Sequence, residues 1–81
     1  MIKVLFFAQT REIIGVASTE VGDEFQTAEQ IRRHLAAQGE RWALALQAGK
    51  LLVAVNQTLV PLESAVKSGD EIAFFPPVTG G

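Results

Sequence analysis

Apolar and polar positions alternate in short segments of this chain, and these segments are separated by stretches with the period of a helix. Residues 2–8 are rich in β-branched and aromatic types, which predicts a strand. Alternation gives this strand two faces, Ile2, Val4, Phe6 and Ala8 on one and Lys3, Leu5 and Phe7 on the other. Because lysine is rarely buried, the second face is expected to meet solvent, with the large Phe7 ring on it.

Residues 9–16 show neither period clearly and predict an irregular or single-turn segment that stops at Gly15. A short second strand is expected near residues 18–21, and Gly22 and Asp23 end it in a turn.

A helix is predicted over residues 27–38. Thr27-Ala28-Glu29-Gln30 has the pattern of a capping box, with a threonine N-cap and a glutamine three residues later. Ala28, Ile31 and Leu35 form its apolar face, and Gly39 is expected to end it. Arg32, Arg33 and His34 lie beside this face, and His34 is interpreted as a solvated helix residue.

A second, shorter helical pattern covers residues 40–48, and Gly49 is expected to end it. Its apolar positions are Trp42, Ala45 and Leu46.

The second half of the chain predicts three strands, over residues 50–55, 58–60 and 71–75. A two-residue turn, Asn56-Gln57, joins the first two, and Gly69-Asp70 turns into the last. Residues 61–68 form a loop whose Leu62 and Val66 reach the core. The expected inward residues are Leu51, Val53, Val55, Ile72 and Phe74, and the outward ones Leu52, Ala54, Leu59, Glu71, Ala73 and Phe75.

This order of elements predicts an α+β fold in which one mixed sheet packs on a helix. The inward sets Val4/Phe6 and Ile72/Phe74 suggest that the first and last strands are parallel neighbours. Phe7 and Phe75 then share an exposed face with Leu52 and Leu59, and an apolar surface of this kind is typical of a site for a protein partner.

Composition limits the classes of function. The chain has 81 residues, enough for one small domain, a net charge of −2 and no basic stripe, so nucleic-acid binding has no support. It has no cysteine and one histidine, so neither a disulfide nor a Cys/His metal site is expected. Its nine carboxylates are scattered, and those of Asp23, Glu24, Asp70 and Glu71 are interpreted as solvated. With neither a signal peptide nor a membrane span expected, the sequence favours a cytoplasmic protein.

The last six residues stand apart from this pattern. They are Pro76, Pro77, Val78, Thr79, Gly80 and Gly81, and no side chain from Ile72 onward is charged. Two consecutive prolines favour an extended chain, and six residues reach roughly 20 Å. Because Gly80 and Gly81 lack a Cβ, the segment is expected to be slim enough for a narrow slot in another protein, with the Gly81 carboxylate as its reactive group.

Several motifs together resemble the small, sulfur-carrying subunit of molybdopterin synthase. They are the element order, Val55-Asn56-Gln57, Ser68-Gly69-Asp70-Glu71 and above all Phe75-Pro76-Pro77-Val78-Thr79-Gly80-Gly81. The resemblance spans the whole chain. It implies a ubiquitin-like β-grasp fold, in a single domain over residues 1–81 whose extended tail begins at about residue 76.

The resemblance also implies a chemical cycle and its partners. An adenylating enzyme akin to ubiquitin-activating enzymes joins the Gly81 carboxylate to AMP from ATP, and sulfur from a donor protein then replaces AMP to give a thiocarboxylate. The tail enters the large synthase subunit, in an expected heterotetramer, and sulfur passes to cyclic pyranopterin monophosphate. Phe7, Leu59 and Phe75 match the positions of the apolar docking patch of this family. The resemblance also implies that the chain binds no cofactor tightly and that the catalytic groups belong to the large subunit.

Three alternatives stay open at this point. The related sulfur carrier of thiamine thiazole synthesis shares the Gly-Gly end, although generally not the Pro-Pro-Val-Thr segment before it. A ubiquitin-like modifier uses the same activated tail to form isopeptide bonds with lysines. A non-covalent adaptor has no need of the tail at all.

Overall fold

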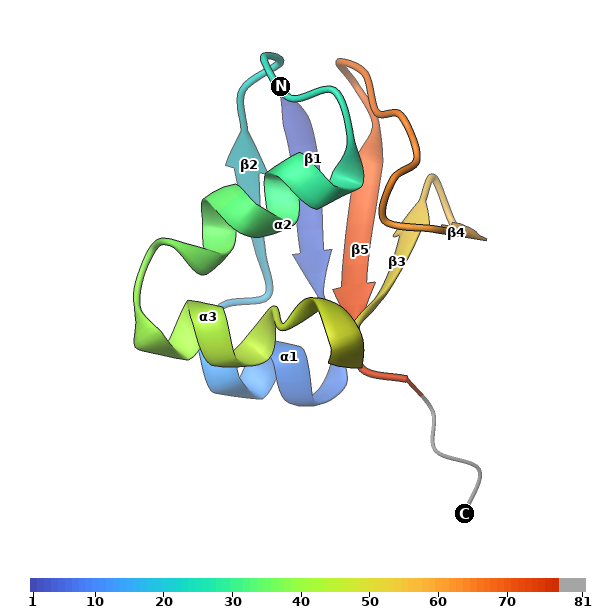
Figure 1. Cartoon of the computed structure of the whole chain (residues 1–81). Helices are drawn as coiled ribbons and strands as arrows, with labels where there is room; N and C mark the ends of the chain where they lie inside the picture. Colours follow the sequence, from blue (N-terminus) through green and yellow to red (C-terminus); the bar gives the residue numbers. More distant parts are fainter. Residues whose placement is uncertain (78–81) are drawn as a thin grey trace.

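A computed structural model describes residues 1–77 of the chain, and its centre is one five-stranded mixed sheet (Figure 1). The strands lie in the order β2-β1-β5-β3-β4. Their bounds are β1 Ile2–Phe6, β2 Ser18–Val21, β3 Leu52–Val55, β4 Thr58–Val60 and β5 Glu71–Phe75. The expected α+β fold, one mixed sheet packed on helices, is confirmed.

The first and last strands are parallel neighbours at the middle of the sheet, as predicted. Val4 lies opposite Ile72 and Phe6 opposite Phe74, and all four side chains are buried. The parallel register continues one step past β1, because the Phe7 amide donates to the Phe74 carbonyl oxygen at 3.2 Å. The carboxyl ends of both strands therefore lie side by side, and β5 continues there into Pro76.

The two-residue turn between β3 and β4 is confirmed. Asn56 and Gln57 have φ values of 50° and 70°, which is the left-handed geometry of a type I′ hairpin turn. Asparagine tolerates this conformation better than most residues, which explains how the turn forms without glycine. The short strand β4 forms one edge of the sheet and β2 the other.

The segment after β1 differs from the prediction. The strand ends at Phe6, and Ala8–Ile14 form a helix, α1, in place of an irregular stretch. Ala8 has a φ of 53° and is exposed, so it does not join the inward face of β1 as expected. Gly15 ends the helix as predicted, in left-handed geometry with its amide 2.8 Å from the Arg11 carbonyl oxygen.

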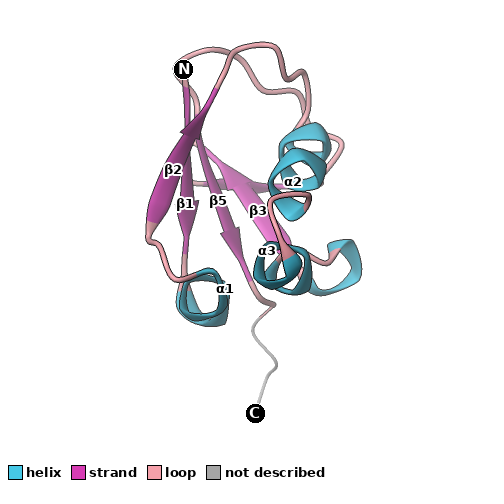
Figure 2. Cartoon of the chain, turned by 90° about the vertical axis from the view of Figure 1, so that its left-hand side faces the viewer, coloured by secondary structure: helices cyan, strands magenta, loops and turns pink. Residues whose placement is uncertain are grey.

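Helix α2 (Ala28–Ala36) packs on one face of the sheet through Ala28, Ile31 and Leu35, the three residues predicted to be buried (Figure 2). It ends earlier than expected, with Ala37 as its C-cap. Gly39 does not close α2 but is the N-cap of the next helix.

Helix α3 (Glu40–Ala45) is shorter than the predicted 40–48, and a separate 3₁₀ turn, η1 (Ala48–Lys50), follows it. Gly49 lies inside this turn and does not end α3. Ala45 and Leu46 are buried as predicted, whereas Trp42 is only partly buried. The Trp42 ring still contacts the core, edge-on to Phe6 with ring centroids 5.6 Å apart.

The hydrophobic core lies between the sheet and helices α2 and α3. Its fully buried large side chains are Ile2, Val4, Phe6, Ile31, Leu46, Val53, Ile72 and Phe74. Burial of one such side chain stabilises the fold by about 1.5–3 kcal/mol. The loop after β4 closes one end of the core with Val66, which is buried, and Leu62, which is partly buried, as expected.

Asp70 is buried, which corrects its interpretation as a solvated carboxylate. Only 5% of its surface is exposed, and its side chain accepts hydrogen bonds from the Asn56 side-chain amide at 3.0 Å and the Lys67 backbone amide at 2.8 Å. Asn56 also accepts from the Glu71 amide at 3.0 Å. The carboxylate thus ties the β3–β4 turn to the start of β5, the strand that carries the tail.

We expect Asp70→Asn to lower the free energy of unfolding at pH 7 by about 1–3 kcal/mol, because its amide NH₂ would face donors that need an acceptor. The hydrogen bond from Asn56, followed by the bond from the Lys67 amide, lowers the pKa of Asp70. A lowered pKa contributes stability that is complete above the ordinary carboxyl value, near 4, and is lost as pH falls through the folded-state value.

Urea unfolding followed by circular dichroism between pH 7 and pH 2 checks this prediction. The wild-type chain should lose stability below about pH 4 more steeply than Asp70→Asn. Glu63→Gln, at an exposed carboxylate of the same loop, is the matched control and should leave the pH 7 stability unchanged. Parallel pH curves for the wild type and Asp70→Asn would contradict the structural role of Asp70.

Candidate functional site

The sheet has one face that the helices leave open. Figure 2 shows α2 and α3 on one side of the sheet and α1 at the end where β1 and β5 finish. The strand registers place the outward residues of neighbouring strands in rows. One row holds Ala73 between Leu5 and Ala54, with Leu59 at its end, and the next holds Phe75 opposite Leu52.

Phe7, Leu59 and Phe75, the predicted docking residues, all lie on or at the end of this open face. Leu59 is 61% and Phe7 48% exposed, whereas Phe75 is partly buried. Continuing the parallel register places Phe7 beside Phe75, because Phe6 lies opposite Phe74. We call these three residues the open-face patch.

Apolar side chains, two of them small, lie between the members of the open-face patch. Ala54 lies opposite both Leu59 and Ala73, so two methyl groups stand in the row next to Phe75. Together with Leu52, which lies opposite Phe75, they make the surface between Leu59 and the two phenylalanines apolar. This arrangement suits an apolar protein partner.

The predicted tail begins directly beside the open-face patch. Pro76 follows the last residue of β5 and is partly buried, and Pro77 is exposed. Val78, Thr79, Gly80 and Gly81, the other predicted tail residues, lie outside the described part of the chain. Their roles stay predictions, as does the role of the open-face patch.

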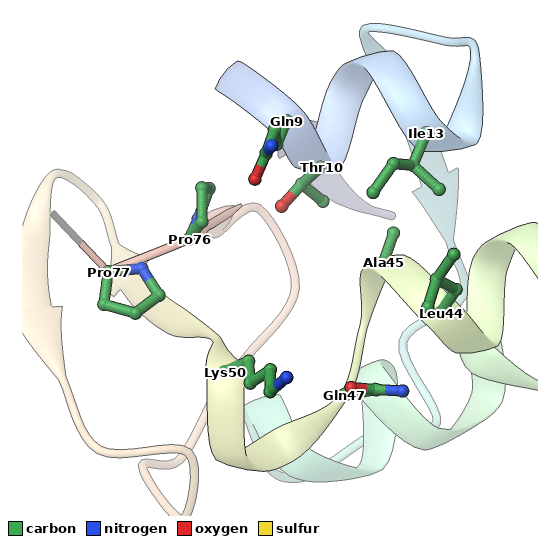
Figure 3. Close-up of a pocket in the computed structure, with 9 residues that line it drawn as sticks. All are labelled: Gln9, Thr10, Ile13, Leu44, Ala45, Gln47, Lys50, Pro76 and Pro77. Atoms are coloured by element: carbon green, nitrogen blue, oxygen red, sulfur yellow. The ribbon is translucent and has the colours of Figure 1, made fainter. Parts of the chain in front are cut away.

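A groove of about 480 Å³ lies at the start of the tail, between α1, α3, η1 and the two prolines (Figure 3). Figure 3 shows the prolines at one end and the aliphatic side chains of Ile13 and Leu44 at the other. Its lining residues are Gln9, Thr10, Ile13, Leu44, Ala45, Gln47, Lys50, Pro76 and Pro77. We call it the tail-root groove; the sequence alone did not indicate it.

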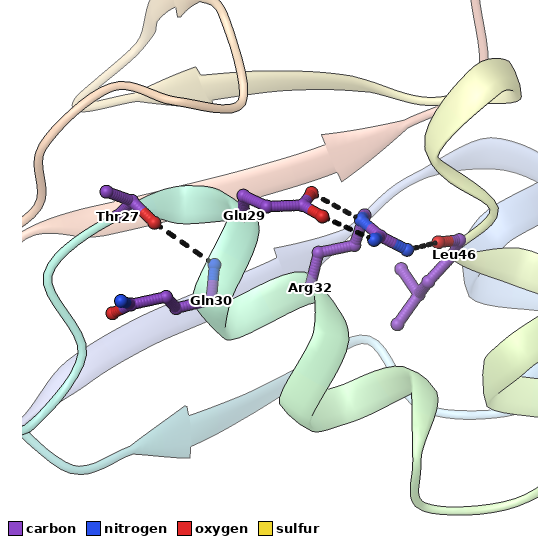
Figure 4. A network of polar contacts seen from close by, with 5 residues as sticks. All are labelled: Thr27, Glu29, Gln30, Arg32 and Leu46. Carbon is purple, nitrogen blue, oxygen red and sulfur yellow. Dashed lines mark hydrogen bonds and ion pairs between the residues drawn. The ribbon is translucent and has the colours of Figure 1, made fainter.

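Arg32 fixes the wall that α3 contributes to this groove (Figure 4). Its guanidinium donates to both Glu29 carboxylate oxygens, at 2.7 and 2.6 Å, and to the Leu46 carbonyl oxygen at 2.7 Å. The hydrogen bonds between the two side chains lower the pKa of Glu29 and raise that of Arg32. Helix α2 is thereby joined to the end of α3 at Leu46, which lies in the sequence between the groove residues Leu44 and Gln47.

The capping box of α2 forms in part. The Thr27 hydroxyl accepts from the Gln30 amide at 3.2 Å, as predicted. The Gln30 side chain does not return to Thr27, however, and instead accepts from the Gln26 amide at 2.7 Å. His34 is exposed as expected and lies against the Phe25 ring, with ring centroids 4.9 Å apart.

Residues 1–77 hold no group of His, Asp and Glu side chains that could bind a metal ion. In the same residues, none of the helices is both long and apolar enough to cross a membrane. Lys3, Lys50 and Lys67 are exposed, as predicted from the sequence. The candidate site is the open-face patch with the tail that leaves beside it, because large apolar side chains are exposed there.

Comparison with known proteins identifies the family of the chain. The model of the ThiS family matches residues 4–81. The molybdopterin synthase sulfur carrier subunit of Haemophilus influenzae is 72% identical over 81 residues, and that of Escherichia coli is 64% identical; each alignment covers both chains completely. The chain belongs to the ThiS family, among its molybdopterin synthase sulfur carrier subunits.

A solved structure agrees with the fold. The complex of subunits 1 and 2 of the molybdopterin-converting factor from Helicobacter pylori contains a chain that is 27% identical. The match covers 99% of this ThiS-family chain and 97% of the other, with a TM-score of 0.67. The β-grasp fold implied by the resemblance is thus confirmed for this chain.

Proposed function

We propose that this chain is the sulfur carrier of a molybdopterin synthase and that its Gly81 holds the transferred sulfur. The observation that carries the proposal is the whole-length identity to sulfur carrier subunits, combined with a tail that leaves the central strand beside an exposed apolar patch. The chain acts as the small, sulfur-donating subunit and brings no catalytic group of its own.

Activation of the tail needs ATP, because a carboxylate is a poor acyl donor until one of its oxygens becomes a leaving group. A Gly81 carboxylate oxygen attacks the α-phosphorus of ATP and pyrophosphate departs, which gives the acyl adenylate. Sulfur at the oxidation level of sulfide then attacks the carbonyl carbon, and AMP leaves with the bonding electron pair. A donor protein that carries a persulfide supplies this sulfur together with two electrons from a reductant.

Transfer takes place in the large subunit, which supplies the catalytic groups. The thiocarboxylate sulfur adds to a carbonyl-level carbon of cyclic pyranopterin monophosphate, and the C–O bond at that carbon breaks, with its oxygen leaving as water. A second water molecule then cleaves the acyl–sulfur bond. Sulfur stays on the pterin, towards the dithiolene of molybdopterin, and the Gly81 carboxylate is restored. Docking of the carrier body raises the effective concentration of the tethered sulfur, which is the expected role of the open-face patch.

A reconstitution with purified components tests the proposal. The chain, thiocarboxylated chemically at Gly81, is mixed with the large subunit and cyclic pyranopterin monophosphate, and molybdopterin is measured. We expect product in proportion to thiocarboxylate, and none from the untreated carrier. Intact mass of the chain isolated from cells should show one oxygen replaced by sulfur. Lysine-linked adducts without thiocarboxylate would instead indicate a protein modifier, and transfer into a thiazole precursor alone would indicate thiamine synthesis.

A further inference from the structure

The tail-root groove is the second surface of this chain that is suited to a protein partner. Leu44 stands at one end of it with 58% of its surface exposed, and Ile13 beside it is partly buried. Large aliphatic side chains at this exposure gain free energy when a partner covers them. The groove is also concave, whereas the open-face patch lies on the surface of a sheet.

The two surfaces are continuous through the tail. Phe75 belongs to the open-face patch, and the next two residues, Pro76 and Pro77, line the groove. A protein that docks on the patch and contacts these two prolines therefore lies next to the groove. Within residues 1–77, the lining of the groove contains one charged side chain, that of Lys50, and no carboxylate.

We propose that the large synthase subunit inserts an apolar side chain, flanked by a carboxylate, into the tail-root groove. The apolar side chain would contact Leu44 and Ile13, and the carboxylate would pair with Lys50. The proposal rests on the proposed function. It assigns the groove to the large subunit, because Pro76 and Pro77 join the groove to the open-face patch, on which the large subunit is expected to dock while it receives the tail.

Binding measurements with the large subunit test this assignment. We expect Leu44→Asp to raise the dissociation constant about tenfold or more, because it places a charge in a covered apolar site. Lys50→Glu should raise the dissociation constant about three- to tenfold. The affinity of the wild type should fall with rising salt, and that of Lys50→Glu should not. Val16→Asp, at an apolar residue that is 43% exposed and outside the groove, is the matched control.

The outcomes separate this inference from the proposed function. If the wild-type chain does not bind the large subunit, the proposed function fails. If the wild type binds and both groove variants bind equally well, or if Val16→Asp weakens binding as much, the inference is overturned. A selective loss of adenylation would instead assign the groove to the activating enzyme and would also overturn it.

Other occupants of the groove would be detected in the chain alone. Self-association that Leu44→Asp abolishes would mean that a second copy fills it. A change in the NMR signals of the Leu44 methyl groups after removal of the residues that follow Pro77 would mean that the chain's own tail fills the groove. Either result contradicts the assignment to the large subunit.

Discussion

Removal of Gly81 should abolish sulfur transfer almost completely while the protein stays folded. The deletion moves the terminal carboxylate back by one residue, about 3.5 Å, which exceeds the tolerance of a positioned reaction. Addition of one residue should have the same effect, because a different carboxylate then ends the tail. The core lies between Ile2 and Phe74, and a terminal tip contributes little to stability, so both variants should unfold like the wild type.

Gly81→Ala separates the shape of the tip from its charge. It keeps the carboxylate and the length of the tail but adds a Cβ where the slot is expected to be narrowest. We expect a partial to severe loss of molybdopterin formation from the thiocarboxylated chain. ATP-dependent adenylation, measured as pyrophosphate release, reports the activating step separately. Full sulfur transfer by the Gly81 deletion would refute the carrier mechanism and favour an adaptor that does not use the tail.

Phe75→Arg should give the second large effect, a loss of binding to the large subunit. The substitution places a guanidinium in the open-face patch, where the partner is expected to exclude water. We expect a cost of at least about 2 kcal/mol, or about 30-fold in the dissociation constant, as measured by titration calorimetry. Val16→Arg, at an exposed apolar residue outside the patch, should bind like the wild type.

The fold of the Phe75 variant has to be checked because Phe75 is partly buried. Circular dichroism and the urea midpoint should match those of the wild type. Leu59→Arg provides a second test, since Leu59 is 61% exposed and its substitution should not disturb the core. If both variants bind the large subunit with wild-type affinity, the open-face patch is not the docking surface.

The pairing of β1 with β5 could be predicted from the sequence because the alternation within each strand shows which of its residues face the core. Val4 and Phe6 alternate with less buried positions, as Ile72 and Phe74 do, and two strands buried on the same face are expected to lie near each other. The outward positions of Phe7 and Leu59 followed from the same alternation. Periodicity thus predicted the open-face patch as well as the core.

Features that depend on distant segments could not be predicted in this way. Helix α1 has only seven residues, and its buried side chains, Thr10 and Ile14, include a polar one, so the helical period was too weak to recognise. A carboxylate such as Asp70 is normally solvated, and its burial depends on Asn56, 14 residues earlier. The tail-root groove combines α1, α3, η1 and the prolines, which no local pattern relates.

The central position of β5 has a mechanical consequence for a carrier that is held by its tail. Hydrogen bonds join β5 to β1 on one side and to β3 on the other, and they run across the strand direction. A pull on Pro77 along the strand therefore loads both ladders in shear, so that many bonds must break together. A tail attached to an edge strand would load only one ladder, so fewer hydrogen bonds would resist the same pull. Under the proposed function, we therefore expect the tail to leave the slot of the large subunit without pulling β5 out of the sheet.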